Sequence, residues 1–268
     1  MHHEEVILKK AFTLAETLIT LAIIGVVAAL TIPTLIQKYR DQVTVNQLKK
    51  HYSMMSQNFK KMLADEDVES LFDTNLVKTF QAGFESGNMM DTLQIFNKYF
   101  NTQLVSMGNS VKVHTLTGDD EIDLFENALT PGTVVFPDGS LLHLQSFIFI
   151  EGFFRRATYS ECLDFMNERG IRNCPGQFAG MFYFVDLNGT KGPNTLGRDI
   201  FNFSVDQYGK VWSNSFECIT PRCLDFVVSN WANGDNGCGK PDKSLKEAGG
   251  IGLGCAARII ENGWKIDY

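Results

Sequence analysis

The longest hydrophobic stretch of the chain lies near its N-terminus. Residues 17–36 are 20 consecutive residues without a charge, preceded by Lys9, Lys10 and Glu16. A bilayer core needs about 20 predominantly apolar helical residues, so this stretch predicts one membrane-spanning helix. An ionisable group near the membrane interior costs about 2–3 kcal/mol, and Glu16 therefore calls for a specific role.

The helical pattern continues beyond the uncharged stretch. Apolar or aromatic residues recur three and four positions apart at Val45, Leu48, Tyr52, Met55, Phe59 and Met62. This spacing places them on one face of an amphipathic helix. We expect a helix from Phe12 to about Asp65, roughly 80 Å long at 1.5 Å per residue. Pro33 is expected to kink it, because proline removes a backbone donor.

The remainder of the chain predicts a mixture of helices and antiparallel strands. Helices are expected at residues 65–80, 92–100, 161–169 and 256–261, with a loop at 83–87. Strands are expected at residues 111–117, 133–136, 140–145, 147–150, 181–187, 200–205 and 210–212. Pro137-Asp138-Gly139 and residues 206–209 are turn sequences that predict two hairpins. The predicted fold class is α+β, a long N-terminal helix packed on an antiparallel β-sheet.

The residues around the start of the apolar stretch carry a family resemblance. Ala11, Phe12, Thr13, Leu14 and Glu16 resemble the N-terminal signature of type IV pilins and type II secretion pseudopilins. That signature is a basic leader and a small residue, then Phe-Thr-Leu-x-Glu and a hydrophobic run. The family usually has glycine where this chain has Ala11. The resemblance implies cleavage between Ala11 and Phe12 by a prepilin peptidase, N-methylation of Phe12, and pairing of Glu16 with a neighbouring subunit's N-terminal amine.

The same resemblance implies a pilin-like fold and a domain organisation. Residues 1–11 would be a leader peptide, 12–37 the transmembrane and assembly helix, 38–65 its amphipathic continuation, and 66–268 a globular head. The implied location is the bacterial inner membrane, crossed once, with the head in the periplasm or outside the cell as part of a filament. The implied partners are other pilin or pseudopilin subunits, prepilin peptidase and an inner-membrane assembly platform.

Other interpretations of the apolar stretch remain open. A secretory signal peptide has a shorter apolar region that ends at a small-residue cleavage site. An uncleaved signal anchor would instead make the chain a monomeric, membrane-anchored periplasmic binding protein. Lys9 and Lys10 face Lys38 and Arg40 across the span, so basic residues do not decide its orientation. Glu16 favours the filament subunit, because a simple anchor gains nothing from a carboxylate there.

The overall charge argues against nucleic acid as a partner. The net charge is −7, and lysines and arginines are dispersed along the chain. A sequence-independent nucleic-acid binder normally has a basic patch or stripe.

All six cysteines lie in the C-terminal part of the chain, at Cys162, Cys174, Cys218, Cys223, Cys238 and Cys255. An even number in an exported region is typical of disulfides. Proximity in sequence favours the pairs Cys162–Cys174, Cys218–Cys223 and Cys238–Cys255. A structural zinc site built from the last four is the rival interpretation.

Asp186, Asn188 and Asp199 form the second candidate site. Short oxygen-bearing side chains beside Gly189 can converge on a hard cation such as Ca²⁺, with main-chain help near Thr190. The spacing differs from an EF-hand, and the segment looks like a loose analogue of the calcium loop of major pseudopilins. An Asx-rich turn without a metal is the alternative.

No catalytic motif was found in the sequence, and we expect no enzymatic activity; an anchored hydrolase is the enzyme alternative. His51 is predicted at the surface of the long helix, and His114 and His143 in separate strands. The aromatic segment at residues 147–159 is interpreted either as a core strand or as a partner surface.

Overall fold

The computed structural model is described for residues 13–86, 90–107, 110–118, 120–124, 132–148, 180–205, 208–213, 216–218, 226–228, 238 and 252–268. The chain divides into two compact units, Met1–Val43 and Thr44–Tyr268. The predicted leader, cleavage site, helix at 161–169 and most of the aromatic segment lie outside the described residues.

Helix α1 (Leu14–Asp65) is 52 residues long. It is unbroken at Pro33, where a kink was expected. Its end matches the predicted end and has a clear backbone cause. Asp67 has a φ of 52°, and the amides of Asp67 and Val68 donate to the carbonyl oxygens of Ala64 and Leu63. This Schellman motif satisfies the last carbonyls of the helix and reverses the chain.

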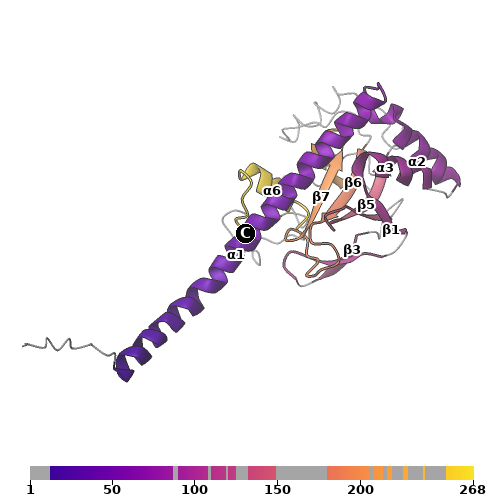
Figure 1. Cartoon of the computed structure of the whole chain (residues 1–268). Helices are drawn as coiled ribbons and strands as arrows, with labels where there is room; N and C mark the ends of the chain where they lie inside the picture. The colour runs from indigo at the N-terminus through magenta and orange to yellow at the C-terminus, as the bar shows by residue number, and fades with distance from the viewer. Residues whose placement is uncertain are drawn as a thin grey trace, which may run out of the picture. The chain divides into compact units, whose positions relative to one another are not determined.

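The part of α1 in the second unit packs onto the sheet by one face (Figure 1). Its buried residues are Val45, Leu48, His51, Met55, Phe59 and Met62. A short 3-10 turn, η1 (Leu71–Asp73), leads to α2 (Asn75–Ser86) and α3 (Met90–Phe100). The predicted helix at residues 65–80 therefore begins later, and the loop expected from 83 is helical through Ser86.

The main sheet has six antiparallel strands in the order β1-β4-β5-β6-β7-β8. They are β1 (Gln103–Met107), β4 (Gly132–Val135), β5 (Leu141–Ile148), β6 (Gly180–Asp186), β7 (Ile200–Val205) and β8 (Val211–Trp212). Two smaller pairs join β2 (Lys112–His114) to β3 (Glu121–Asp123), and β9 (Phe216–Cys218) to β10 (Phe226–Val228). Helix α6 (Cys255–Glu261) follows.

Both predicted hairpins are confirmed: β4 pairs with β5, and β7 with β8. The separate strand expected at residues 147–150 is wrong, because β5 continues to Ile148. The sequence pattern did not predict β1, β3, β9 or β10. The coarse fold prediction is confirmed as an α+β arrangement with a long N-terminal apolar helix and an antiparallel sheet.

Aromatic side chains fill the space between the helices and the sheet. Phe96 and Phe100 stack with ring centroids 4.3 Å apart, and the Phe59 ring meets Phe100 edge-on at 4.9 Å. Tyr183 and Phe203, from neighbouring strands, stack at 5.7 Å. This core fixes the ends of β6 and β7, where the second candidate site lies.

Candidate functional site

The first candidate site is the first turn of α1. Thr13 Oγ1 accepts a hydrogen bond from the Glu16 amide at 3.2 Å, and Glu16 Oε2 accepts one from the Thr13 amide at 2.8 Å. The Thr13 hydroxyl also lies 2.8 Å from the same oxygen. This reciprocal pair is a capping box, which satisfies two of the otherwise unpaired backbone donors at a helix start. Glu16 therefore has a partner within its own chain, which sequence reasoning missed although Thr13 and Glu16 have capping-box spacing.

Glu16 uses only one of its two carboxylate oxygens in this box. Among the described residues, Oε1 accepts no hydrogen bond. Ala11 and Phe12, the predicted cleavage site, lie outside the described residues. The carboxylate thus keeps one oxygen free for a further donor.

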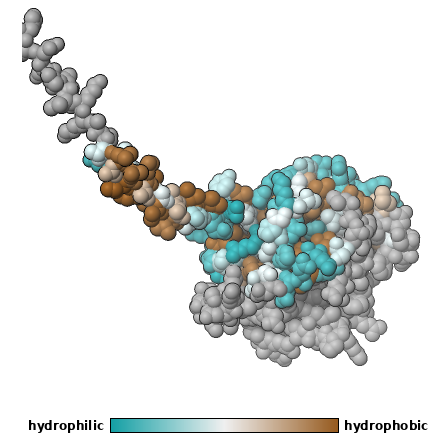
Figure 2. All heavy atoms as spheres, turned by 90° about the horizontal axis from the view of Figure 1, so that it is seen from below, coloured by the Kyte–Doolittle hydropathy of each residue, from teal (hydrophilic) through white to brown (hydrophobic). Residues whose placement is uncertain are grey.

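The N-terminal half of α1 is long and apolar enough to cross a membrane. Figure 2 shows hydrophobic side chains gathered along it. Its large apolar side chains are exposed, namely Leu14, Leu18, Ile19, Leu21, Ile23, Ile24, Val26, Val27, Leu30, Ile32, Leu35 and Ile36. A helix that exposes apolar residues all round needs an apolar environment.

Three of the four threonine hydroxyls in residues 17–36 are satisfied by the helix itself. Thr17 Oγ1 donates to the Leu14 carbonyl at 2.8 Å, Thr20 to that of Thr17 at 2.9 Å, and Thr31 to that of Val27 at 2.8 Å. Such internal bonds would satisfy a threonine hydroxyl in a bilayer core, where no water is available.

The second candidate site lies in the loop from β6 to β7. Asp186, the last residue of β6, and Asp199, just before β7, are 2% and 7% exposed. Asp186 Oδ1 accepts from the amides of Asn188 at 3.1 Å and Gly189 at 2.9 Å. The two Asp199 oxygens accept from the amides of Thr195 at 2.6 Å and Asn194 at 2.9 Å. The structure thus brings together all three predicted site residues, because Asn188 Nδ2 also donates to Asp199 Oδ2 at 2.8 Å.

The charge of Asp199 affects the ionisation of Asp186. Burial, and then the charge of Asp199, raise the pKa of Asp186 to about 7, although two backbone hydrogen bonds oppose this. Two buried like charges are unfavourable unless a proton or a cation compensates them. Either a proton on Asp186 or a cation beside the two carboxylates would relieve this repulsion.

Two amide oxygens in the same loop lack partners among the described residues. They are the buried Oδ1 atoms of Asn188 and Asn194, which accept no hydrogen bond from that part of the chain. A buried polar atom without a partner costs about 1–3 kcal/mol and needs an explanation. Carboxylate and amide oxygens together are ligands that Ca²⁺ prefers. Asn194, which the sequence interpretation did not include, joins the set.

The described residues contain no group of three or more His, Cys, Asp or Glu that could hold a metal ion. A calcium site does not require one, because amide and main-chain carbonyl oxygens serve as ligands. Asp186, Asp199, Asn188 and Asn194 fit a hard divalent cation by the chemistry of their oxygens.

His51 is buried, so its predicted surface position is wrong. It is 4% exposed and lies against the rings of Phe136, Tyr183 and Phe203 at centroid distances of 5.5, 5.7 and 6.1 Å. His51 lies three residues after Leu48 and four before Met55, on the apolar stripe of the helix. This spacing is a sequence signal from which its burial could have been predicted. Burial lowers the pKa of His51 to about 3, with a small opposing effect of Asp138.

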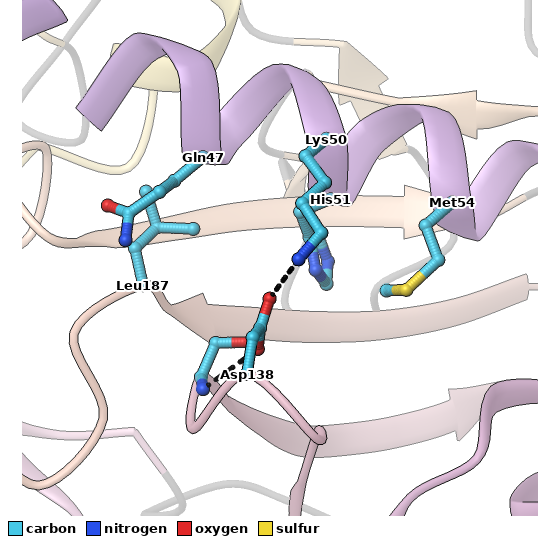
Figure 3. Close-up of a pocket in the computed structure, with 7 residues that line it drawn as sticks. Gln47, Lys50, His51, Met54, Asp138 and Leu187 are labelled. Atoms are coloured by element: carbon cyan, nitrogen blue, oxygen red, sulfur yellow. Dashed lines mark hydrogen bonds and ion pairs between the residues drawn. The ribbon is translucent and has the colours of Figure 1, made fainter. Parts of the chain in front are cut away.

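A small cavity of about 20 Å³ lies beside His51, between α1 and the β4–β5 turn (Figure 3). Two of the residues that line the cavity form an ion pair, with Lys50 Nζ 2.7 Å from Asp138 Oδ2. Asp138 Oδ1 also accepts a hydrogen bond from the Ser140 hydroxyl at 2.6 Å. Burial opposes the ionised form, but these bonds prevail and lower the pKa of Asp138 to about 2. The cavity has room for about one water molecule, so it is not a substrate pocket.

The two other histidines of the described residues lie in strands, as expected. His143 lies in β5, with Nδ1 2.9 Å from Thr133 Oγ1, and burial lowers its pKa to about 4. His114 is exposed at the end of β2. Neither the His51 cluster nor the His143 pair places a nucleophile beside a histidine in an open pocket.

One of the three predicted cysteine pairs is described. A disulfide joins Cys238 to Cys255, with Cα atoms 4.8 Å apart. Those two thiols are therefore not available to zinc in this state. Cys162, Cys174 and Cys223 lie outside the described residues, as does the side chain of Cys218.

Comparison with known proteins gives a family. The model of a family of unknown function, DUF6613, matches residues 34–223, more than two thirds of the chain. The chain belongs to the DUF6613 family. No curated protein and no solved structure matches it. The DUF6613 region contains the β6–β7 loop with all four oxygen-bearing residues, whereas Glu16 and α6 lie outside it.

Proposed function

We propose that the chain is a structural subunit of a type IV pilus or a type II secretion pseudopilus-like filament. In this proposal, prepilin peptidase removes residues 1–11, and the mature chain is held in the bacterial inner membrane by α1 until it assembles. The observation that carries the proposal is an exposed, uncharged apolar helix that begins with the Thr13–Glu16 capping box. The proposal assigns no catalytic activity to the chain.

The exposed apolar side chains explain why such a subunit would assemble. In the bilayer they contact lipid, which is as apolar as they are. Outside it, each leucine or isoleucine left in water forgoes about 1.5–3 kcal/mol of burial free energy. Identical helices packed side by side would bury these residues again. A helix bundle is therefore the form in which this segment can leave the membrane.

The free oxygen of Glu16 explains how neighbouring copies would find their register. Cleavage after Ala11 would create a positively charged amine on Phe12, one residue before the capping box. Glu16 Oε1 has no partner among the described residues and can accept such an amine from a neighbouring copy. A charge pair inside an apolar interface can specify register, because a shifted arrangement leaves both charges unpaired.

The proposal is tested by co-expression of two full-length copies with different C-terminal tags, together with a prepilin peptidase. We expect detergent-solubilised complexes to contain both tags, and their recovery to require the peptidase. The monomeric, uncleaved anchor predicts that each tag is recovered alone, with or without the peptidase. That result would refute the filament subunit.

A second proposed function rests on the two unpartnered amide oxygens in the β6–β7 loop. We propose that this loop binds Ca²⁺ through Asp186, Asn188, Asn194 and Asp199. A bound cation would supply positive charge to the two buried carboxylates and join the ends of β6 and β7. The chain's own contribution is a preformed set of oxygens, held by backbone amides that donate to Asp186 and Asp199.

Thermal unfolding of the full-length protein in detergent tests the calcium site. Calcium at about 100 times its dissociation constant adds about 2.7 kcal/mol. For a protein of this size we expect Tm to rise by about 5–10 °C relative to a chelator. Asp199→Asn should abolish the rise, whereas Asp138→Asn, in a neighbouring turn, should keep it. Equal Tm values in calcium and in chelator would refute the site.

A further inference from the structure

The turn that carries Asn194 and Asp199 is tied down at its centre by the C-terminal segment of the chain. Tyr268 Oη donates a hydrogen bond to the Gly197 carbonyl at 2.6 Å. Two guanidinium groups lie over the Tyr268 ring, that of Arg198 at 5.3 Å and that of Arg258 at 5.1 Å from the ring centroid. The last residue of the described chain therefore contacts the turn between two of its oxygen-bearing residues.

The disulfide packs against the same turn. A Cβ atom placed on Gly197 would lie 2.5 Å from Cys255 Sγ, so only glycine fits beneath the sulfur. Gly252, just before α6, approaches the backbone so closely that a Cβ there would lie 2.7 Å from the Leu196 carbonyl oxygen. Both glycines have positive φ angles, 76° and 101°, which favour glycine for a second reason.

A buried arginine connects the disulfide to the C-terminal residues. Arg258 Nη1 donates to the Cys238 carbonyl at 2.7 Å, and Nε donates to Asp267 Oδ1 at 2.7 Å. Arg258 is 3% exposed, so its buried positive charge is stabilised by these partners instead of by water. Cys238, α6 and Tyr268 are therefore held together as one support beneath the turn.

Strand β2 holds the same turn through separate hydrogen bonds. The His114 amide donates to the Asn194 carbonyl at 2.9 Å, and the Leu196 amide donates to the His114 carbonyl at 3.0 Å. Strand β2 would therefore keep the turn in place even without the C-terminal support, though with more freedom.

We propose that the Cys238–Cys255 disulfide organises the β6–β7 loop for cation binding, so that calcium affinity depends on the oxidation state of this cysteine pair. The inference rests on the calcium site proposed above and adds its regulation. Closing the bond removes two protons and two electrons from two thiols, and a disulfide-bearing oxidant accepts the electrons. The loop would thus reach full affinity only in a compartment that forms disulfides.

The physical basis is preorganisation. Four oxygens must converge on one ion, and any freedom of the turn lowers the affinity. Removing the disulfide loosens α6 and Tyr268, and with them Gly197. Coupling between calcium binding and disulfide formation is reciprocal. If the disulfide raises the calcium affinity by some factor, bound calcium must therefore protect the disulfide against reduction by the same factor.

Calcium titration calorimetry on the full-length protein in detergent tests the inference, after chelator treatment. We expect Cys238→Ser/Cys255→Ser to bind calcium about 10-fold or more weakly than the oxidised protein. Tyr268→Phe, which keeps the ring but loses the bond to Gly197, should weaken binding about 3- to 5-fold, as expected for one hydrogen bond. Val77→Ala, which removes buried volume in α2 away from the loop residues, should leave the affinity unchanged.

The reciprocal measurement covers the case in which the double variant does not fold. The extent of reduction of Cys238 and Cys255 by dithiothreitol, followed by thiol trapping and peptide mass spectrometry, should fall about 10-fold in saturating calcium. The coupling would be overturned if Cys238→Ser/Cys255→Ser and Tyr268→Phe bound calcium as tightly as the wild type. It would also be overturned if calcium did not affect the reduction of the disulfide. If the oxidised wild type binds no calcium, the calcium site itself fails and the coupling with it.

Discussion

Among single residues, Glu16 has two distinct reasons to be at the start of an apolar helix. One is local, since its carboxylate closes the capping box with Thr13. The other is the proposed pairing of its free oxygen with a neighbour's amine. The two reasons make different demands on the side chain: capping needs only a hydrogen-bond acceptor, whereas pairing needs a negative charge.

Glu16→Gln separates these two roles. Glutamine retains the capping box, so membrane insertion and helix start should be kept. The charge is lost, so we expect co-purification of differently tagged copies to fall by at least 10-fold. Glu16→Ala should lose both the cap and co-assembly. Normal co-assembly of the glutamine variant would show that the cap alone accounts for Glu16.

His51 is the second residue with a testable consequence. Its pKa is about 3 in the folded protein and about 6.5 when unfolded. The unfolded chain therefore binds more protons between these values, and stability falls as the pH drops through 6.5 toward 3. By linkage, His51 alone should lower the free energy of unfolding by about 2 kcal/mol between pH 7.5 and pH 5.

The check is chemical denaturation in detergent at both pH values. The free energy of unfolding should fall by about 2 kcal/mol less in His51→Leu than in the wild type between pH 7.5 and pH 5. The contribution of His143, whose pKa is also lowered, remains in both proteins. Equal pH dependence in His51→Leu and the wild type would contradict this account.

Among the elements, α1 carries two kinds of surface on one continuous helix. From Val45 onward only one stripe is apolar and is buried, whereas the uncharged residues 17–36 expose apolar side chains all round. The change in pattern predicted a change in surroundings, from a membrane or a helix bundle to a folded head. Each part should therefore respond differently to the loss of a large side chain.

Phe59→Ala should lower the free energy of unfolding of the second unit by about 3–5 kcal/mol, because Phe59 is fully buried against Phe100. Leu30→Ala, in the exposed apolar part, is the matched control and should leave that unfolding free energy unchanged. Denaturant titration followed by tryptophan fluorescence measures both. A similar effect of the two substitutions would contradict the division of α1 into a packed and an exposed part.

The accuracy of the sequence predictions follows the range of the interactions involved. The end of α1, the two hairpins and α6 depend on local patterns and were predicted closely. Strand β1 was missed because its partner, β4, lies about 30 residues later, and no local turn signals the pairing. His51 was misplaced because its polar side chain was assigned to solvent against the helical spacing.

The same distinction applies to the candidate site. Asp186, Asn188 and Asp199 were found because they are close in sequence and surround a glycine turn. Asn194 was not predicted to lie beside Asp199, since this position depends on how the loop folds back against β2. The contact of Tyr268 with Gly197 spans 71 residues and has no sequence signature at all.

For the whole molecule, the proposed assembly and the proposed loop site belong to different units of the chain. In the proposed function, the apolar helix would determine where the protein resides and what it joins. The disulfide and the β6–β7 loop would determine the condition in which the second unit is stable. An exported subunit would meet both oxidant and calcium after its head crosses the membrane, so its final stability would be reached only there.

The most direct test is the N-terminal sequence and mass of the full-length protein extracted from cell membranes that contain a prepilin peptidase. The account predicts a polypeptide that begins at Phe12 and carries one additional methyl group on its amine. Recovery of a chain that still carries Lys9, Lys10 and Ala11 in those membranes would contradict it.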